Sequence, residues 1–141
     1  MKIIVKKLKM TQVWQEDTVV PVTVLEVVSD DKEVLKNVKE GDRLVLSGKS
    51  KWKGFQGVVK RHGFHGGPKS HGQKHSLRAP GSIGATAPQR TIPGKKMPGR
   101  MGGDTITIKN VLVVKILPEE NSFMIKGAVP GMRGTELIIK T

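Results

Sequence analysis

The chain has 141 residues, the size of one ordinary domain, and its 25 Lys and Arg outnumber 12 Asp and Glu to give a formal charge of +13. This excess predicts a polyanionic partner. Cysteine is absent, which excludes disulfides, thiolate metal sites and a cysteine nucleophile. The apolar runs are far shorter than the ~20 residues that cross a bilayer, and the first residues lack the features of a secretory signal or a transit peptide. We therefore expect a soluble protein of a reducing compartment with no membrane partner.

The sequence before residue 49 indicates short β-strands. Residues 18–28 and 43–46 are rich in Val, Thr and Leu, and turn residues at 40–42 precede the second run. Pro21 lacks the N–H that a sheet ladder uses, so we expect it at an edge or a bulge of its strand. Residues 31–38 are the only stretch of the sequence that hints at a helix.

Residues 49–103 differ sharply from the rest of the chain in composition. They contain 12 Lys and Arg with no Asp or Glu, all four His, 12 of the 17 Gly and 5 of the 8 Pro, whereas the other 86 residues have a net charge of +1. Only 13 of these 55 residues are apolar, which is too few for a hydrophobic core. The prolines fix φ and the glycines allow close backbone approach, so we predict a long irregular extension with a specific path.

Short β-strands resume after this segment. Residues 105–117, 122–126 and 136–140 are rich in Ile, Val and Thr and are separated by turn residues. The apolar alternation along the first of these strands changes phase, so we expect a bulge near Asn110. Five to eight short strands outside the basic segment predict a small antiparallel β-barrel, because closure leaves no exposed sheet edge.

These elements predict a mainly β fold in two parts. Residues 1–48 and 104–141 form the β-barrel body. Residues 49–103 are inserted between two strands as an extended Gly/Pro-rich basic loop, and a loop of this length in a compact protein is expected to be functional.

The cations of residues 49–103 are candidates for phosphate contacts, since each can displace counterions and no carboxylate in the segment competes for it. The four His can stack on bases and bond to phosphate or to a 2′-OH, which favours RNA. Trp52, Phe55 and Phe64 lie beside the same cations, although Phe55 would equally suit the barrel core. The predicted RNA-binding residues are Lys49, Lys51, Trp52, Lys53, Lys60, Arg61, His62, His65, Lys69, His71, Lys74, His75, Arg78, Arg90, Lys95, Lys96 and Arg100.

The spacing of the four His also resembles a metal site superficially. The surrounding Lys and Arg oppose a dication and no nearby carboxylate would orient the imidazoles, so we expect neither a metal nor another cofactor. The same lack of carboxylates argues against acid–base catalysis, and the glycine spacings do not match a phosphate-cradling loop, so we expect neither an enzyme nor a small-molecule substrate. Two alternatives stay open: a DNA-binding or architectural protein that uses the same arm, and a metal-dependent nuclease built on the His cluster.

Several short motifs resemble the L-three family of universal large-ribosomal-subunit proteins. Residues 53–62 (KGFQGVVKRH) carry the most extended resemblance. Further motifs occur in the family's order at residues 10–14 (MTQVW), 72–78 (GQKHSLR), 80–84 (PGSIG), 94–102 (GKKMPGRMG), 126–131 (KGAVPG) and 137–140 (LIIK).

The resemblance implies a β-barrel on the surface of large-subunit rRNA, with an extension that threads between rRNA helices towards the peptidyl-transferase centre and has its tip near residues 85–93. It implies neighbouring large-subunit proteins as further partners, a role in assembly without catalytic groups, and a place in a cytoplasmic or organellar ribosome. Two differences stand out. Only 20 residues separate Val28 from Lys49, where family members commonly carry a longer stretch, and residues 85–87 read ATA where some members carry a methylated glutamine.

Overall fold

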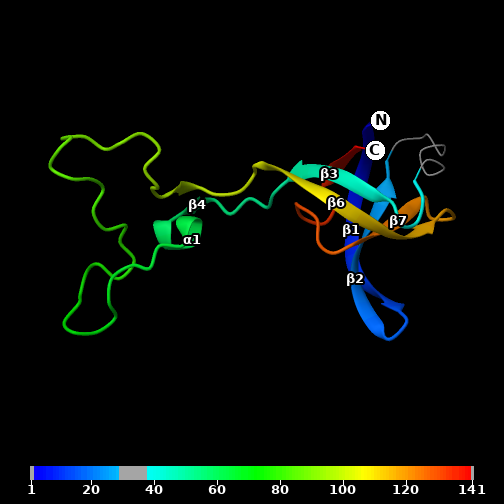
Figure 1. Cartoon of the computed structure of the whole chain (residues 1–141), viewed down its shortest axis with the longest axis horizontal. Coiled ribbons are helices and arrows are strands. Elements are labelled where there is room, and N and C mark those ends of the chain that lie inside the picture. Colours follow the sequence, from blue (N-terminus) through cyan, green and yellow to red (C-terminus); the bar gives the residue numbers. More distant parts are fainter. Residues whose placement is uncertain (1, 29–37, 141) are drawn as a thin grey trace. The chain divides into compact units, whose positions relative to one another are not determined.

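The computed structural model describes residues 2–28 and 38–140 (Figure 1). Its contacts divide the chain into two units, one formed by Met1–Lys51 with Gly103–Thr141 and the other by Trp52–Gly102. Residues 31–37 of the predicted helix lie outside the described residues. No helix in the described ranges has the length and apolar character needed to cross a membrane.

The first unit is a closed antiparallel β-barrel, as the sequence predicted. Its strands follow one another around the barrel in the order β1-β2-β7-β6-β3-β8, and each pair of neighbours is antiparallel. Closure satisfies the backbone groups that an open sheet would leave at its edges. The strands are β1 (Lys2–Gln15), β2 (Thr18–Val27), β3 (Arg43–Lys49), β6 (Thr105–Leu117), β7 (Ser122–Lys126) and β8 (Glu136–Lys140).

Strand β1 was not predicted, although it pairs with both β2 and β8. Its first half alternates between exposed and buried residues, with Ile3, Val5 and Lys7 on the inner face. A lysine thus stands where the period of a half-buried strand calls for an apolar residue. Beyond Lys7 the strand is largely exposed and forms a hairpin with the start of β2.

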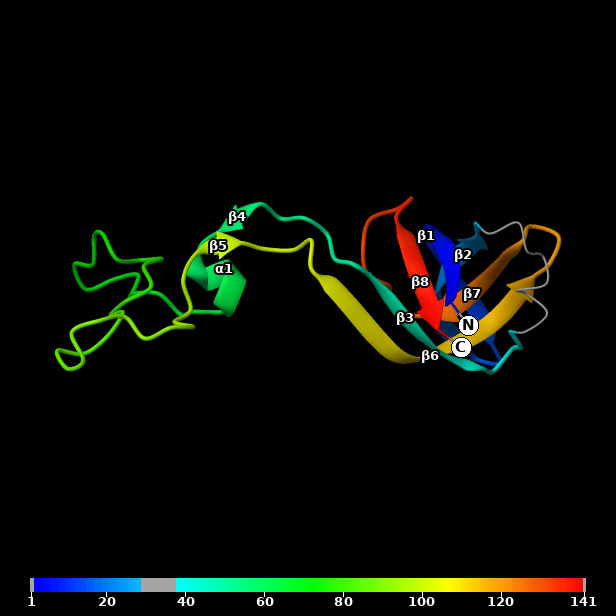
Figure 2. The ribbon, with the colours of Figure 1, turned by 90° about the horizontal axis from the view of Figure 1, so that it is seen from above.

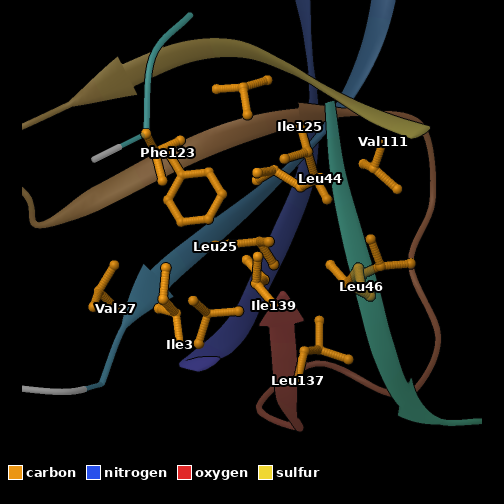
Figure 3. Close-up of a cluster of buried hydrophobic side chains, with 14 residues drawn as sticks. Ile3, Leu25, Val27, Leu44, Leu46, Val111, Phe123, Ile125, Leu137 and Ile139 are labelled. Atoms are coloured by element: carbon orange, nitrogen blue, oxygen red, sulfur yellow. The ribbon is translucent and has the colours of Figure 1, made fainter. Parts of the chain in front are cut away.

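The core of the barrel is filled by aliphatic side chains around one aromatic ring. Figure 3 shows Phe123, Leu25 and Ile139 pointing into the interior from three different strands. All three are at most 1% exposed, as are Leu46 and Leu137. Complete burial of each such side chain contributes about 1.5–3 kcal/mol, so this cluster provides most of the driving force for closing the barrel.

Two local predictions about the strands are confirmed. Asn110 has a positive φ of 59°, and the pairing of β3 with β6 shifts register between Leu44 and Leu46, directly opposite this residue. The β2–β7 ladder begins at Val22, so Pro21 pairs with β1 alone and receives a hydrogen bond from the N–H of Gly127 at 2.8 Å. The phase change and the proline therefore mark a bulge and a local sheet edge.

The side chain of Lys7 fastens the loop before β8 to the barrel. Its ammonium group donates hydrogen bonds to the carbonyl oxygens of Val129 and Gly131, both at 2.9 Å, and its backbone N–H donates to the carbonyl of Thr135 at 3.0 Å. The residue is only 8% exposed. This burial lowers the pKa of Lys7 from 10.5, and the nearby charge of Lys51 lowers the pKa further.

The chain leaves and re-enters the barrel on neighbouring strands. Lys49 at the end of β3 pairs with Thr105 at the start of β6. Beyond the ladder, the N–H of Ser50 donates to the carbonyl of Asp104 at 2.9 Å, and the N–H of Gly103 donates to the carbonyl of Ser50 at 3.3 Å. The ends of the inserted segment are therefore held together by the barrel itself.

Candidate nucleic-acid interface

The second unit contains regular structure that the sequence did not predict. Figure 2 shows helix α1 (Val58–His62) beside the two-stranded pair β4 (Phe55–Gln56) and β5 (Gly99–Arg100). The helix follows Gly57 and ends at Gly63, whose φ of 73° suits a left-handed cap and whose N–H bonds to the carbonyl of Val59 at 3.1 Å. Val58 is 2% exposed, so even this basic segment buries one apolar side chain completely.

Two predicted RNA-binding residues of α1 also hold this unit together. Arg61 donates from Nη1 to the carbonyl oxygen of Met97 at 2.8 Å, and Nε2 of His62 lies 3.0 Å from the same oxygen. The arginine passes so close to Gly99 that a Cβ on this glycine would lie 2.6 Å from Nη1. A side chain at Gly99 would therefore require the guanidinium of Arg61 to shift, a relation that the sequence gave no signal for.

Trp52, Phe55 and Arg100 form an exposed group that we call the aromatic face. The guanidinium carbon of Arg100 lies 5.0 Å from the centroid of the Trp52 ring, within the range of a cation–π contact. Phe55 is the register partner of Arg100 across the β4–β5 pair, and directly opposed residues project from the same side of a sheet. Phe55 is 75% exposed, so its alternative placement in the barrel core is wrong.

A second feature of this unit is a loop closed at its base by glycines. The N–H of Gly67 donates to the carbonyls of Ser76 and Leu77 at 3.1 and 3.2 Å. Gly66 lies so close to the opposite side that a Cβ there would be 2.2 Å from the carbonyl oxygen of Leu77. The close approach explains the Gly-Gly pair, because no other residue type leaves the backbones room to meet.

Two open cavities flank this closure. One of about 640 Å³ lies among Val59, His65, Lys69, Leu77 and Arg78. The other, of about 600 Å³, has His65 in common with the first and extends to Phe64, Ser76 and Pro80. Both combine apolar surface with groups that can donate hydrogen bonds, and both fall in the size range of small-ligand sites.

None of the cations of residues 49–103 has a carboxylate in the same segment to pair with. All 12 Lys and Arg of residues 49–103 are exposed. Lys49 and Lys51 belong to the barrel unit, and the other ten belong to Trp52–Gly102. No carboxylate occurs in the segment, and exposed like charges that lack local compensation raise the positive potential around them.

The four His do not assemble into a metal centre within the described ranges. No group of three or more His, Cys, Asp or Glu among residues 2–28 and 38–140 is placed to hold a metal ion. His62 contacts the carbonyl of Met97 instead, and Nδ1 of His65 lies 3.3 Å from the carbonyl of Gly66. The alternative of a nuclease built on the His cluster therefore gains no support from the geometry.

Comparison with curated proteins gives bacterial relatives that carry one name. Proteins called large ribosomal subunit protein uL3 are 55% identical over 102 residues in Chlorobium limicola, 51% over 117 in Chloroherpeton thalassium and 49% over 117 in a Geobacillus species. These matches cover 72%, 82% and 79% of this chain but 49%, 56% and 55% of the relatives. The chain thus spans about half the length of the curated relatives it matches.

A family model gives the same result over a range that includes the second unit and part of the barrel unit. The model described as Ribosomal protein L3 matches residues 19–123. This range runs from β2 to the start of β7 and includes the whole of Trp52–Gly102. Because the family model matches most of the chain and the curated relatives are about 50% identical to it, the chain belongs to the ribosomal protein L3 family.

Proposed function

We propose that this chain is a structural component of the large ribosomal subunit that binds large-subunit rRNA through residues 49–103. The observation that carries the proposal is the exposure of all 12 Lys and Arg in a segment without a single carboxylate. In a free protein these charges only repel one another. Beside RNA each of them can neutralise a phosphate and release a counterion.

The role proposed for the segment is to let phosphates approach one another. Where RNA helices converge, cations between the strands offset the repulsion between phosphates. The family resemblance points to the rRNA around the peptidyl-transferase centre as the binding site. It also points to neighbouring large-subunit proteins as further partners. The prolines restrict the free chain, so less conformational entropy is lost on binding. The β4–α1–β5 group supplies an ordered start to the segment, and the barrel serves as its folded anchor.

Salt-dependent binding of the full chain tests this proposal. If about half of the 12 cations contact phosphates, the logarithm of the affinity for an rRNA transcript falls with log salt at a slope of about −4 to −5. If Lys69, Lys74 and Lys95 are all among these contacts, their replacement by Gln reduces that slope by about 2–3, since each phosphate contact contributes roughly one unit. These three side chains are exposed and lie outside the barrel unit.

The matched control removes the same charge from the barrel. Lys109, Lys115 and Lys126 are also exposed, and their replacement by Gln is expected to leave the slope nearly unchanged. Equal slopes for the two triple variants would contradict the proposal. A duplex DNA of equal length is included as competitor, because tighter binding to DNA than to rRNA would favour the architectural DNA-binding alternative.

A further inference from the structure

The aromatic face differs from the other cationic surfaces of Trp52–Gly102 because two large apolar rings are left in solvent. Trp52 is 57% exposed and Phe55 is 75% exposed, although Phe55 lies in the β4–β5 pair and Trp52 directly precedes the hydrogen-bonded residue Lys53. The cation–π contact of Arg100 with Trp52 contributes only about 0.5–1 kcal/mol at an exposed site, so the fold gains little from leaving these rings in solvent. They are the groups that single-stranded nucleic acids stack on.

The backbone beneath the aromatic face is fixed before any partner binds. The N–H of Lys53 donates to the carbonyl of Met101 at 3.0 Å, and the N–H of Met101 donates to the carbonyl of Gly54 at 2.9 Å. These bonds continue the β4–β5 pairing as far as Lys53, the residue after Trp52. A preformed site loses less entropy on binding than a flexible one, which makes this surface a better base acceptor than the irregular parts of the segment.

We propose that the aromatic face binds an unpaired nucleobase of the RNA by stacking, with Trp52 and Phe55 contacting base faces and Arg100 contacting both a ring and a phosphate. This inference rests on the proposed function and adds to it a contact that reads the base rather than the backbone charge. The Arg100 side chain is exposed and its guanidinium lies over the Trp52 ring, so a phosphate oxygen can reach its N–H donors from solvent. Paired bases inside a duplex expose no faces, and the site therefore requires an unpaired base.

The test compares two probes of equal charge. One is oligoadenylate and the other is a ribose–phosphate oligomer of the same length without bases. Trp52→Ala is expected to weaken binding of oligoadenylate about 10-fold, the usual scale for one lost base–aromatic stack, and to change binding of the abasic oligomer less than about 2-fold. Trp52→Phe retains most of the affinity because a smaller ring still stacks.

The control variant uses the other tryptophan. Trp14 is 66% exposed on β1, in the barrel unit, and Trp14→Ala is expected to leave both affinities unchanged. In a Trp14→Phe chain all tryptophan fluorescence comes from Trp52, since the sequence contains two Trp. Oligoadenylate is expected to quench this fluorescence and the abasic oligomer is not.

Failure of this inference can be told apart from failure of the proposed function. If Trp52→Ala weakens both probes equally, or weakens neither, while the wild-type chain keeps its steep salt dependence, the stacking proposal is wrong and the rRNA-binding proposal stands. If the wild-type chain binds neither an rRNA transcript nor oligoadenylate, both are wrong. Circular dichroism of Trp52→Ala is expected to match the wild type, because the side chain is mostly in solvent.

Discussion

The ammonium group of Lys7 lies 2.9 Å from the carbonyl oxygen of Gly131, across 124 residues of sequence. A second bond of the same length joins it to Val129. Lys7 is on the inner face of β1, where an apolar side chain is expected. Its two hydrogen bonds, to Val129 and Gly131, hold the loop before β8 and are called the Lys7 latch below. The latch makes the stability of the barrel depend on a titratable group.

Removing the latch is expected to destabilise the barrel. Lys7→Met keeps the length of the side chain but leaves two carbonyls without their charged donor, so we expect the free energy of unfolding to fall by about 2 kcal/mol. Urea denaturation of the full chain measures the loss. Lys6→Met, on the exposed face of the same strand, is the control and should lie within about 0.5 kcal/mol of the wild type. Similar losses in both variants would mean that the two hydrogen bonds contribute little.

The lowered pKa of Lys7 predicts that stability rises with pH in the alkaline range. In the unfolded chain the group titrates at its usual 10.5, whereas burial lowers the pKa of Lys7 in the folded chain. Between the two values the unfolded state binds more protons, and the free energy of unfolding therefore increases with pH through this window and is lower below it. Comparing urea denaturation of wild type and Lys7→Met from neutral pH upward isolates this residue. A difference between the two that stays constant or shrinks would contradict the prediction.

The Gly66 closure predicts different effects for two glycines with nearly the same backbone conformation. Gly66 and Gly72 have φ of 78° and 77°, so alanine strains either position by roughly 1 kcal/mol. Only at Gly66 does the new Cβ meet another atom, the Leu77 carbonyl oxygen, whereas nothing lies within 4 Å at Gly72. We expect Gly66→Ala, but not Gly72→Ala, to speed hydrogen exchange of the Gly67 amide. Equal rates in both variants would mean that the backbones do not approach so closely.

Limited proteolysis is expected to distinguish the two units and to report RNA binding. Trypsin cleaves after Lys and Arg, and the ten such residues of Trp52–Gly102 are exposed, mostly on irregular backbone. We expect early cleavage there in the free chain and slow cleavage in the barrel strands, whose backbones are held in ladders. An rRNA transcript is expected to protect Trp52–Gly102. Identical cleavage patterns with and without RNA would show that these residues are not covered.

The strands that the sequence predicted well are rich in Ile, Val and Thr and are bounded by turn residues. Residues 105–117, 122–126 and 136–140 form β6, β7 and β8 with the predicted bounds. Strand β1 escaped prediction because Lys7 occupies an inward position and breaks the apolar alternation after Val5. Lys7 can be buried because its ammonium group donates hydrogen bonds to two carbonyls of a loop distant in sequence. No local sequence pattern encodes this tertiary contact.

The candidate site shows the same contrast between features that the local sequence encodes and features that depend on distant contacts. Net charge and the missing carboxylates indicated the basic segment, and the exposure of its cations agrees with that interpretation; which of them contact RNA stays a prediction. The sequence did not indicate α1, because a five-residue helix between Gly57 and Gly63 is too short to display a period. The helix is held by contacts of Arg61 and His62 with the carbonyl of Met97, which lies more than 30 positions further along the chain.

The pairing of Lys49 with Thr105 has a consequence for how such a chain can change over generations. The two ends of the insertion are hydrogen-bonded in the adjacent strands β3 and β6. A change in the length of the insertion therefore does not change which residues of the two strands pair. Each doubling of a flexible loop adds only about 0.6 kcal/mol of closure cost. Mutations that lengthen, trim or rewrite the insertion can therefore accumulate while the barrel is inherited unaltered.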